Sequence, residues 1–471
     1  MLLLRPQYIH MSKRKLVLVN PRGKHRIGFV ANRESRYPPL GLLIIAALTP
    51  KDWEISLKDE NFEEFEYEDA DLVGITSFTS TVTRAYDIAK LYTSKKTPVI
   101  MGGIHASMLP QEAEQYVNSV VIGEAESVWQ NILEDFESGH LKKRYNGVRL
   151  PLKHSPIARH DLLHPDYMFD SIQTTRGCPM QCEFCSVHSF NGKAYRTRPI
   201  ENVLDELETI KSKSIMFVDD NIVGYNKPAR DHAKAIFRGM IERGIKKDWF
   251  CQASINFGDD DELLDLAAEA GCRLVLIGIE SEKVDALQSM KKRSNLKAGP
   301  DNYEKIFDKI QSHGISVLGT FIFGLDTDTL SDLKDRQNYI LSSNVNAAQV
   351  SILTPFPGTI TYTQYEKEGR ITETNYPKDW EKYWGGEVVI EPKNISAAEL
   401  TKFKFDNIDS LYNRKNLMKV LRRTLKTTKN AKAAMWAFSA SAHYNNMAYE
   451  NNPEKHIVLK DIFGSLVEQY K

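Results

Sequence analysis

The sequence predicts an α/β protein in which two successive sets of parallel strands are followed by a mainly helical region. Three observations predict this fold class. Short, continuous apolar runs alternate with amphipathic helical periods from about residue 15 to residue 136, and the alternation restarts after Asp170. This alternation of strands and helices stops near residue 365, and an aromatic segment and then a helical segment follow. Continuous apolar strands separated by helices are typical of parallel sheets that are covered by helices.

The chain length agrees with several domains. Its 471 residues are enough for two or three domains of ordinary size. We expect a first domain, a linker, a second domain and a C-terminal region that covers the substrate, with boundaries at 1–150, 151–170, 171–364 and 365–471.

Composition limits the location and the partners. Lys+Arg and Asp+Glu are both 62, so no global charge predicts a nucleic-acid partner. No apolar run is long enough to span a bilayer, and Leu2–Leu4 is too short for a signal peptide. The five cysteines are an odd number. We therefore expect a cytoplasmic protein with reduced thiols.

The first domain reads as a doubly wound, Rossmann-like sheet. Ligands of such sheets bind beyond the carboxyl ends of the strands. Small residues stand at these ends, including Ser77, Gly102 and Gly103, so a large ligand can approach the backbone there. The expected strands cover 15–20, 71–77, 97–103 and 119–123, with helical periods over 81–92 and 126–136.

The second domain contains six strand–helix units, which predict a partial (β/α)6 barrel that is open on one side. Active residues of barrels collect at the carboxyl ends of the strands. The loop after the first of these strands contains three cysteines. The expected strands cover 171–175, 214–223, 248–256, 273–281, 314–324 and 347–358, with helices over 199–212, 228–243, 259–270, 303–313 and 328–341.

The three cysteines are Cys178, Cys182 and Cys185, in the spacing C-x3-C-x2-C. Cysteine thiolates bind iron–sulfur clusters. Three ligands leave the fourth iron of a cubane open to a group outside the protein, which is a catalytic arrangement. A zinc knuckle completed by His188 stays as an alternative, although zinc ligands usually come as two separated pairs. The remaining two cysteines read as small buried hydrophobic residues.

This motif resembles that of the radical SAM superfamily. Phe184 directly precedes the last cysteine and Gly177 directly precedes the first, as in that superfamily. The resemblance implies a 4Fe-4S cluster whose open iron is chelated by S-adenosylmethionine (SAM), with Phe184 near the adenine. An electron passed into SAM would give a 5′-deoxyadenosyl radical, which removes hydrogen from an unactivated carbon. An external electron donor such as a flavodoxin or ferredoxin is implied as well.

The same resemblance assigns SAM contacts to several strand ends. Asp219, Asp220 and Asn221 follow the second barrel strand, where the family contacts the SAM amino group. Two adjacent carboxylates are costly to bury without a cation or donor, although a helix cap or solvated turn stays open for the last two residues. The other expected SAM-binding residues are Gln252, Ser254, Glu280, Ser281, Gly319 and Thr320.

Nearly the whole chain resembles the cobalamin-binding radical SAM enzymes, which include the class B radical SAM methyltransferases. The first domain by itself resembles the cobalamin-binding Rossmann domain, and Ser77, Gly102 and Gly103 fall where that domain has its later small-residue motifs. His25 stands near the position of a cobalt-binding histidine, but Gly23 replaces the Asp of the D-x-H-x-x-G motif, which weakens this assignment. The family's other features are RYPPLGLLIIAAL, VGITS, GG-x-H and G-E-x-E, which occur here in order.

The resemblance implies cobalamin-dependent C-methylation of an unactivated carbon in a small-molecule, lipid or peptide substrate. A radical SAM enzyme that forms rings, couples carbons or rearranges its substrate without methyl transfer is one alternative. A non-catalytic corrinoid or iron–sulfur carrier is another. A tRNA methylthiotransferase is disfavoured, because its second cluster needs cysteines in the first domain and none precedes Cys178.

The C-terminal region combines aromatic and basic sequence. Residues 374–386 are aromatic and rich in turns, and we expect them to cover the open side of the barrel. Helical sequence follows over 396–426, and basic residues gather between 414 and 432. Peripheral membrane contact is one interpretation of a basic amphipathic helix, whereas a solvated helix face is the commoner one.

Overall fold

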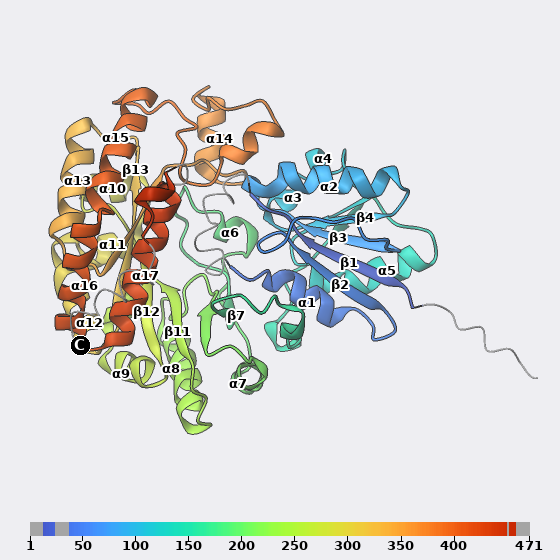
Figure 1. Ribbon diagram of the computed structural model, residues 1–471, viewed down its shortest axis with the longest axis horizontal. Coiled ribbons are helices and arrows are strands. Elements are labelled where there is room, and N and C mark those ends of the chain that lie inside the picture. Colours follow the sequence, from blue (N-terminus) through green and yellow to red (C-terminus); the bar gives the residue numbers. More distant parts are fainter. Residues whose placement is uncertain (1–12, 24–36, 450–451, 458–471) are drawn as a thin grey trace, which may run out of the picture.

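The computed structural model describes residues 13–23, 37–449 and 452–457. Two α/β units lie side by side, and the C-terminal helices pack on the second unit (Figure 1). This arrangement confirms the predicted fold class. None of the helices in these described ranges is long and apolar enough to cross a bilayer.

The first unit contains a six-stranded parallel sheet in the order β2-β1-β3-β4-β5-β6. The edge strands β2 and β6 escape sequence-based prediction, because edge strands bury less of their surface and EISLKD and RYN are correspondingly polar. The strands are β1 (Lys15–Asn20), β2 (Glu54–Asp59), β3 (Leu72–Thr76), β4 (Val99–Gly102), β5 (Ser119–Ile122) and β6 (Arg144–Asn146).

Helices cover both faces of this sheet. Leu16 and Leu18 of β1 pack with Trp129, whereas Val17 and Val19 belong to the apolar layer on the other face. The alternation follows from the two-residue period of a strand, and both layers are needed because β1 is central. The helices are α1 (Leu40–Leu48), α2 (Val82–Ser94), α3 (Ile104–Met108), α4 (Pro110–Ala113) and α5 (Trp129–Glu137).

The second unit is a six-stranded parallel sheet in the order β14-β13-β12-β11-β10-β7, with β7 and β14 at its edges. The number and order of strands confirm the partial (β/α)6 barrel. Its strands are β7 (Asp170–Ile172), β10 (Ser214–Phe217), β11 (Asp248–Ala253), β12 (Cys272–Glu280), β13 (Ser316–Phe323) and β14 (Ala347–Ile352). The helices between them are α7 (Ile200–Thr209), α8 (Lys227–Glu242), α9 (Asp261–Glu269), α10 (Val284–Ser289), α11 (Arg293–Ala298), α12 (Tyr303–Ser312) and α13 (Leu330–Ser342).

Helix α17 (Ala431–Ala448) packs into the apolar interior formed by the beginnings of the barrel strands. Trp436 lies 5.3 Å from Phe250 between ring centroids, and Ala437 joins the same cluster. The hydroxyl of Tyr444 donates to Gln349 at 2.7 Å. The helix therefore fills the end of the barrel that is opposite to the carboxyl ends of the strands.

The aromatic segment 374–386 lies at the junction of the two units. Trp380, which is 1% exposed, donates from its indole nitrogen to Glu112 of the first unit at 3.0 Å. Thr83 of α2 donates to the carbonyl of Pro377 at 2.7 Å. The segment therefore fixes the C-terminal region to the first unit.

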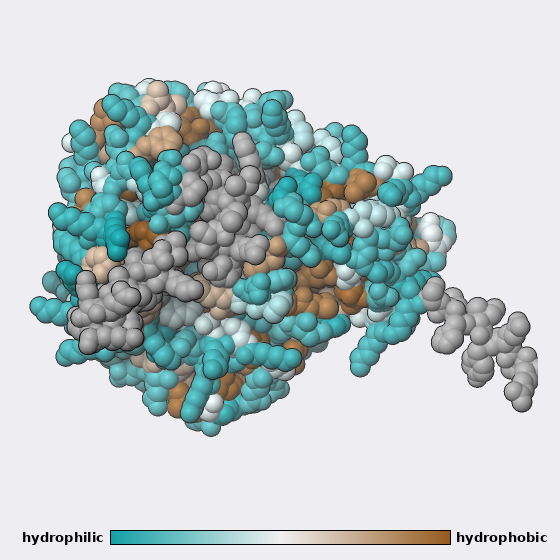
Figure 2. All heavy atoms as spheres, viewed as in Figure 1, coloured by the Kyte–Doolittle hydropathy of each residue, from teal (hydrophilic) through white to brown (hydrophobic). Residues whose placement is uncertain are grey.

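Helix α15 (Ala397–Leu411) and helix α16 (Arg414–Thr428) cover the outside of the barrel. The face of the molecule in Figure 2 is mainly hydrophilic, and its hydrophobic residues are scattered among charged ones.

Candidate active site

The cysteine loop lies between β8 (Thr175–Arg176) and α6 (Val187–Phe190), and β8 pairs antiparallel with β9 (Arg196–Thr197). Gly177 opens the loop with φ +95°, and a Cβ there would lie 2.2 Å from the Ala194 oxygen. Only glycine fits this position without a backbone shift. The Cys178 nitrogen donates to the Gly192 oxygen at 3.0 Å, which closes the loop.

The three thiols share one buried environment. Cys182 is 8% exposed, and the other two are half-buried. Burial raises the pKa of Cys178 and Cys182, and it raises the pKa of Cys185 to about 12. The thiols are close enough to influence one another electrostatically. Three buried thiols fit a cationic iron cluster, because metal binding releases their protons and the cluster compensates the negative charge of the resulting thiolates.

The donor set fits a cubane better than a single zinc ion. Among the described residues, no three or more His, Cys, Asp and Glu side chains converge closely enough for one metal ion. In a cubane each cysteine binds a different iron, so the sulfurs need not converge on one point. The described residues therefore do not form the convergent ligand set that a zinc site completed by His188 would need.

A buried lysine, Lys292, lies beside the thiols. Its Nζ is 2.5 Å from Glu280 Oε1 and 5.8 Å from the centroid of the Phe184 ring. Its charge lowers the pKa of all three thiols. Burial alone would lower the pKa of Lys292, but Glu280 and Cys182 raise it. No local pattern singles out this residue, because MKKRSN reads as a solvated turn.

Glu280 holds an unusual backbone conformation at the end of β12. Its φ is +63°, and the register with β13 shifts between Gly278 and Glu280. Such a conformation costs a non-glycine residue about 1–3 kcal/mol and persists only where its surroundings hold it. Glu280 Oε2 accepts from Thr320 Oγ1 at 3.2 Å, and Oε1 meets Lys292. Two of the predicted SAM residues, Glu280 and Thr320, are therefore brought together.

Asp219 and Asp220 anchor the base of the cysteine loop. Asp219 is fully buried, and its Oδ1 accepts from the Thr174 nitrogen at 2.9 Å and from Thr175 Oγ1 at 2.6 Å. Its Oδ2 has no partner within the described residues, and burial raises its pKa to about 6. Asp220 Oδ2 accepts from the Gly177 nitrogen at 3.1 Å. Both carboxylates are thus held by the segment that leads into the loop.

A chain of polar side chains connects the next strand ends to the first cysteine. Asn221 Nδ2 donates to Ser254 Oγ at 3.4 Å, and Ser254 Oγ lies 2.5 Å from the Tyr225 hydroxyl. The Cys178 thiol donates to this hydroxyl at 3.8 Å. Tyr225 has no sequence signal, because it follows a strand end without a motif.

The other predicted SAM residues face different surroundings. The sequence neighbours of Gln252 on β11 belong to the core on the outside of the barrel. Because side chains of a strand alternate between its two faces, Gln252 points into the barrel, where it is half-buried. Ser281 is fully buried and accepts from Arg336 Nη2 at 3.0 Å. A Cβ on Gly319 would lie 3.1 Å from the Phe321 ring and 3.2 Å from Val345, so its side-chain position faces outward.

Arginines beside the cysteine loop connect it to the first unit. Arg196 pairs bidentately with Glu124, with Nη1 to Oε2 at 3.0 Å. Arg176 pairs with Glu126 at 2.6 Å and approaches Glu124 at 3.5 Å. These guanidinium groups are therefore neutralised by carboxylates of the first unit.

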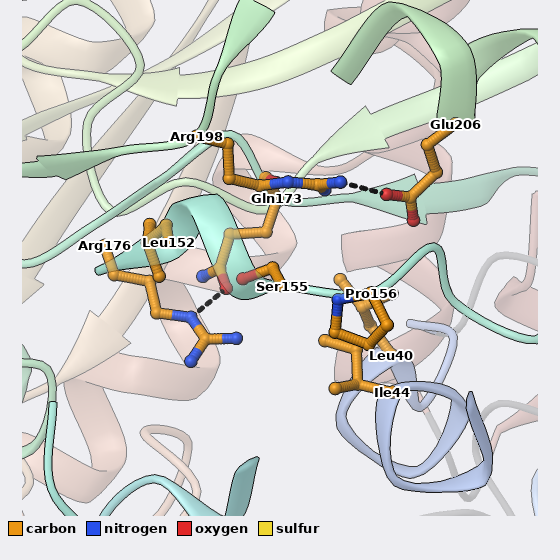
Figure 3. A pocket seen from close by; sticks show the side chains of 9 residues that line it. All are labelled: Leu40, Ile44, Leu152, Ser155, Pro156, Gln173, Arg176, Arg198 and Glu206. Atoms are coloured by element: carbon orange, nitrogen blue, oxygen red, sulfur yellow. Dashed lines mark hydrogen bonds and ion pairs between the residues drawn. The ribbon is translucent and has the colours of Figure 1, made fainter. Parts of the chain in front are cut away.

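Arg198 belongs to a separate ion pair. It lies 2.6 Å from Glu206, across a small pocket from Arg176 (Figure 3). The pocket has a volume of about 10 Å³, which is room for one water molecule and too little for a cofactor.

The rim of the first sheet brings Ser77, Gly102 and Gly103 together. Ser77 is 1% exposed, and its hydroxyl donates to the Gly102 oxygen at 2.9 Å. Gly103 has φ +97°, and a Cβ there would lie 2.7 Å from the Ser77 oxygen. Phe78, which follows Ser77, is 59% exposed. His25 lies outside the described residues.

Comparisons with known proteins agree with both units. The Radical SAM superfamily model matches residues 172–340, and the B12 binding domain model matches residues 27–133. The chain is 31% identical to the bacteriochlorophyllide d C-12(1)-methyltransferase of Chlorobaculum tepidum, over 83% of this chain and 85% of that one. It is 28% identical to the hopanoid C-2 methylase of Rhodopseudomonas palustris, over 71% of this chain and 65% of that one.

Solved structures share the fold. The methyltransferase TsrM from Kitasatospora setae, with tryptophan and a SAM analogue bound, gives a TM-score of 0.63 at 18% identity, covering 90% of this chain and 89% of that one. The radical enzyme OxsB, with aqua-cobalamin and SAM bound, gives a TM-score of 0.66 at 12% identity. The match covers 98% of this chain and 82% of that one. The chain therefore belongs to the cobalamin-binding radical SAM methyltransferase family, whose cofactors are a 4Fe-4S cluster, SAM and cobalamin.

Proposed function

We propose that this enzyme methylates an unactivated carbon of a hydrophobic, polycyclic small molecule. The observation that carries the substrate class is the match over both units to a bacteriochlorophyllide methyltransferase. A second relative is named for a hopanoid, which is also polycyclic and apolar. The exposed ring of Phe78 at the rim of the first unit supports the same class, because it offers apolar surface beside the expected cofactor position.

The residues that would hold the cofactors are on two facing units. Cys178, Cys182 and Cys185 would bind three irons of the cluster, with Phe184 beside them. When bound, the cluster and SAM would supply the radical chemistry that activates the substrate carbon, and cobalamin would supply the methyl group. The protein's part is to bind, to orient and to exclude water.

Glu280 and Lys292 suit the ammonium and the carboxylate of SAM. The Glu280 carboxylate can accept from an ammonium group, and the Lys292 ammonium can donate to a carboxylate. Their mutual distance of 2.5 Å keeps both charges compensated before SAM binds. The strained backbone of Glu280 fixes the direction of its carboxylate.

The rim residues of the first unit suit a flat macrocycle. Gly102 and Gly103 are half-buried and lack side chains, so a ring system can approach their backbone. Ser77 supports this role indirectly by fixing the end of β4. The assignment of His25 to cobalt stays a prediction. A reduced cytoplasmic location suits the free thiols.

Anaerobic reconstitution with iron, sulfide and cobalamin tests the proposal. The enzyme is incubated with a reductant, CD3-labelled SAM and, in turn, a chlorophyllide, a hopanoid and a short peptide. We expect 5′-deoxyadenosine and transfer of the labelled methyl group to one of the two polycyclic molecules, detected by mass spectrometry. Formation of 5′-deoxyadenosine with a rearranged but unlabelled product would contradict methyl transfer. Labelling of the peptide alone would contradict the substrate class.

A further inference from the structure

We propose that the outer face of the cysteine loop is the docking surface for a small acidic one-electron carrier of the flavodoxin or ferredoxin class. The proposal rests on the proposed function, in which the cluster must be reduced from outside. Electron transfer slows steeply with distance, so the carrier has to dock where little protein covers the cysteines.

Two other sides of the loop are already occupied. The first unit holds its base through Arg196 and Glu124. Helix α14 (Ile360–Lys367) holds its far side, where the Thr361 nitrogen donates to the Glu183 oxygen at 3.1 Å. Pro179 and Gln181 lie between the cysteines and are exposed. They are therefore the short route from solvent to Cys178 and Cys182.

Cationic side chains flank this exposed stretch. The Lys193 Nζ donates to Gln181 Oε1 at 3.0 Å, and Lys193 is exposed. The Lys291 Nζ lies 2.6 Å from Glu183 Oε1, and its side chain is 55% exposed. Gln181 and Glu183 are the two neighbours of Cys182 in the sequence. The two lysines therefore stand on either side of a cluster ligand.

Arg293 extends the basic surface. It is exposed, begins α11, and its nitrogen donates to the Lys291 oxygen at 2.9 Å. The three cations stand beside one carboxylate, Glu183, so these four side chains keep a net positive charge, although the chain as a whole is neutral with 62 residues of each sign. Cations at the rim of an interface steer an acidic partner and fix its orientation. The charge of the surface is thus what selects a carrier with carboxylates around its redox group.

The docked carrier transfers a single electron to the cluster. One electron leaves the reduced carrier and enters the cluster, and no covalent bond forms or breaks. The carrier is oxidised by one electron and the cluster is reduced by one.

The test uses reconstituted holoenzyme with the substitutions K193Q, K291Q and R293Q together. Binding of oxidised flavodoxin is measured by calorimetry at low salt, without turnover. We expect about tenfold weaker binding than in the wild type, and a weaker dependence on salt, because three rim charges are lost. SAM cleavage driven by reduced flavodoxin should need about tenfold more carrier for the half-maximal rate. Cleavage driven by dithionite should be unchanged, because a small reductant does not need the docking surface.

A matched control removes the same charge elsewhere. The substitutions K415Q, K419Q and R422Q lie on α16, which is on the outer side of the barrel unit, away from α6 (Figure 1). We expect wild-type binding of flavodoxin. Unchanged binding by the first variant, or equal weakening by both variants, would overturn the docking surface. Absence of SAM cleavage with dithionite in the wild type would instead contradict the proposed function, while the binding measurement would still decide the docking surface.

Discussion

At the scale of single residues, Lys292 and Glu280 form an ion pair within the group of cysteines. Lys292 is 12% exposed and Glu280 is 8% exposed in their side chains. A buried ion pair is weak evidence for stability, but removal of one partner leaves the other charge uncompensated. The pair is therefore better explained by binding than by folding.

Replacement of Lys292 tests this interpretation. Lys292→Met keeps the aliphatic packing but removes the charge beside Glu280. We expect SAM to bind at least roughly tenfold more weakly, while the iron content of the protein stays near the wild-type value. Calorimetry with SAM and an iron assay measure the two effects.

Lys291→Met is the control for this substitution. Lys291 is the exposed neighbour in the sequence, so its loss should leave SAM affinity unchanged. Wild-type SAM affinity in Lys292→Met would contradict a role of Lys292 in SAM binding.

Gly177 provides a second test at the residue scale. Gly177→Ala would place a Cβ 2.2 Å from the Ala194 oxygen at φ +95°, so the loop must shift. We expect a loss of about 2–3 kcal/mol of stability and lower cluster retention. Thermal unfolding and iron content after desalting measure both.

Gly139→Ala separates backbone strain from the clash. Gly139 has φ +74°, but nothing lies within 4 Å of its added Cβ. Its substitution should cost about 1 kcal/mol and leave cluster retention unchanged. Equal effects of the two substitutions would show that the contact with Ala194 is unimportant.

At the scale of elements, the linker between the units is fixed by one histidine. His160 Nδ1 lies 3.0 Å from Asp170 of β7, and Nε2 lies 3.0 Å from Glu206 of α7. Arg198 completes the network through its pair with Glu206. Burial lowers the pKa of His160, but the two carboxylates outweigh it and raise the pKa to about 9.

This network predicts a pH dependence of stability. Because the folded pKa of His160 exceeds its unfolded value of about 6.5, the stabilisation is complete below pH 6.5 and is lost as the pH rises through 9. We expect about 3 kcal/mol of stability to disappear over this range, measured by chemical denaturation at several pH values. His160→Gln should flatten this slope, whereas His140→Gln, at an exposed histidine, should keep it. An unchanged slope in His160→Gln would contradict the assignment.

Sequence patterns predict the bounds of some strands and miss the ends of others. The strand β1 has the expected bounds, because its inner residues LVLV are a continuous apolar run and strands flank it on both sides. The strand expected over 214–223 ends at Phe217, because Asp219 and its neighbours hold the base of the cysteine loop instead of a ladder. Periodicity reports burial, so it cannot show where a buried segment leaves the sheet.

At the scale of the whole molecule, ion pairs and one tryptophan join the two units. Arg196 and Glu124 are 14% and 7% exposed in their side chains. Trp380 donates to Glu112, which also lies 3.2 Å from His105. These contacts set the distance between the cysteine loop and the rim of the first sheet, and methyl transfer depends on that distance.

Glu124→Gln tests the coupling of the units. The substitution leaves Arg196 with an uncharged partner, whereas Arg176 keeps its pair with Glu126, so we expect about 2 kcal/mol lower stability and less cooperative unfolding in calorimetry. Methyl transfer should fall more than SAM cleavage, because cleavage needs only the barrel unit. Glu134→Gln, on the exposed face of α5, is the control. Equal losses of both activities would contradict a positioning role.

The sequence by itself determined the fold class and the family, and it singled out Cys178, Cys182 and Cys185 as the predicted cluster ligands. These features are local, because periodicity reports burial and the cysteine motif lies within eight residues. Only the tertiary structure decided that Lys292 faces the thiols, that Tyr225 reaches Cys178 across 47 residues, and that Arg196 meets Glu124 across 72. Such contacts depend on how the strands and the two units pack, and no short pattern records that packing.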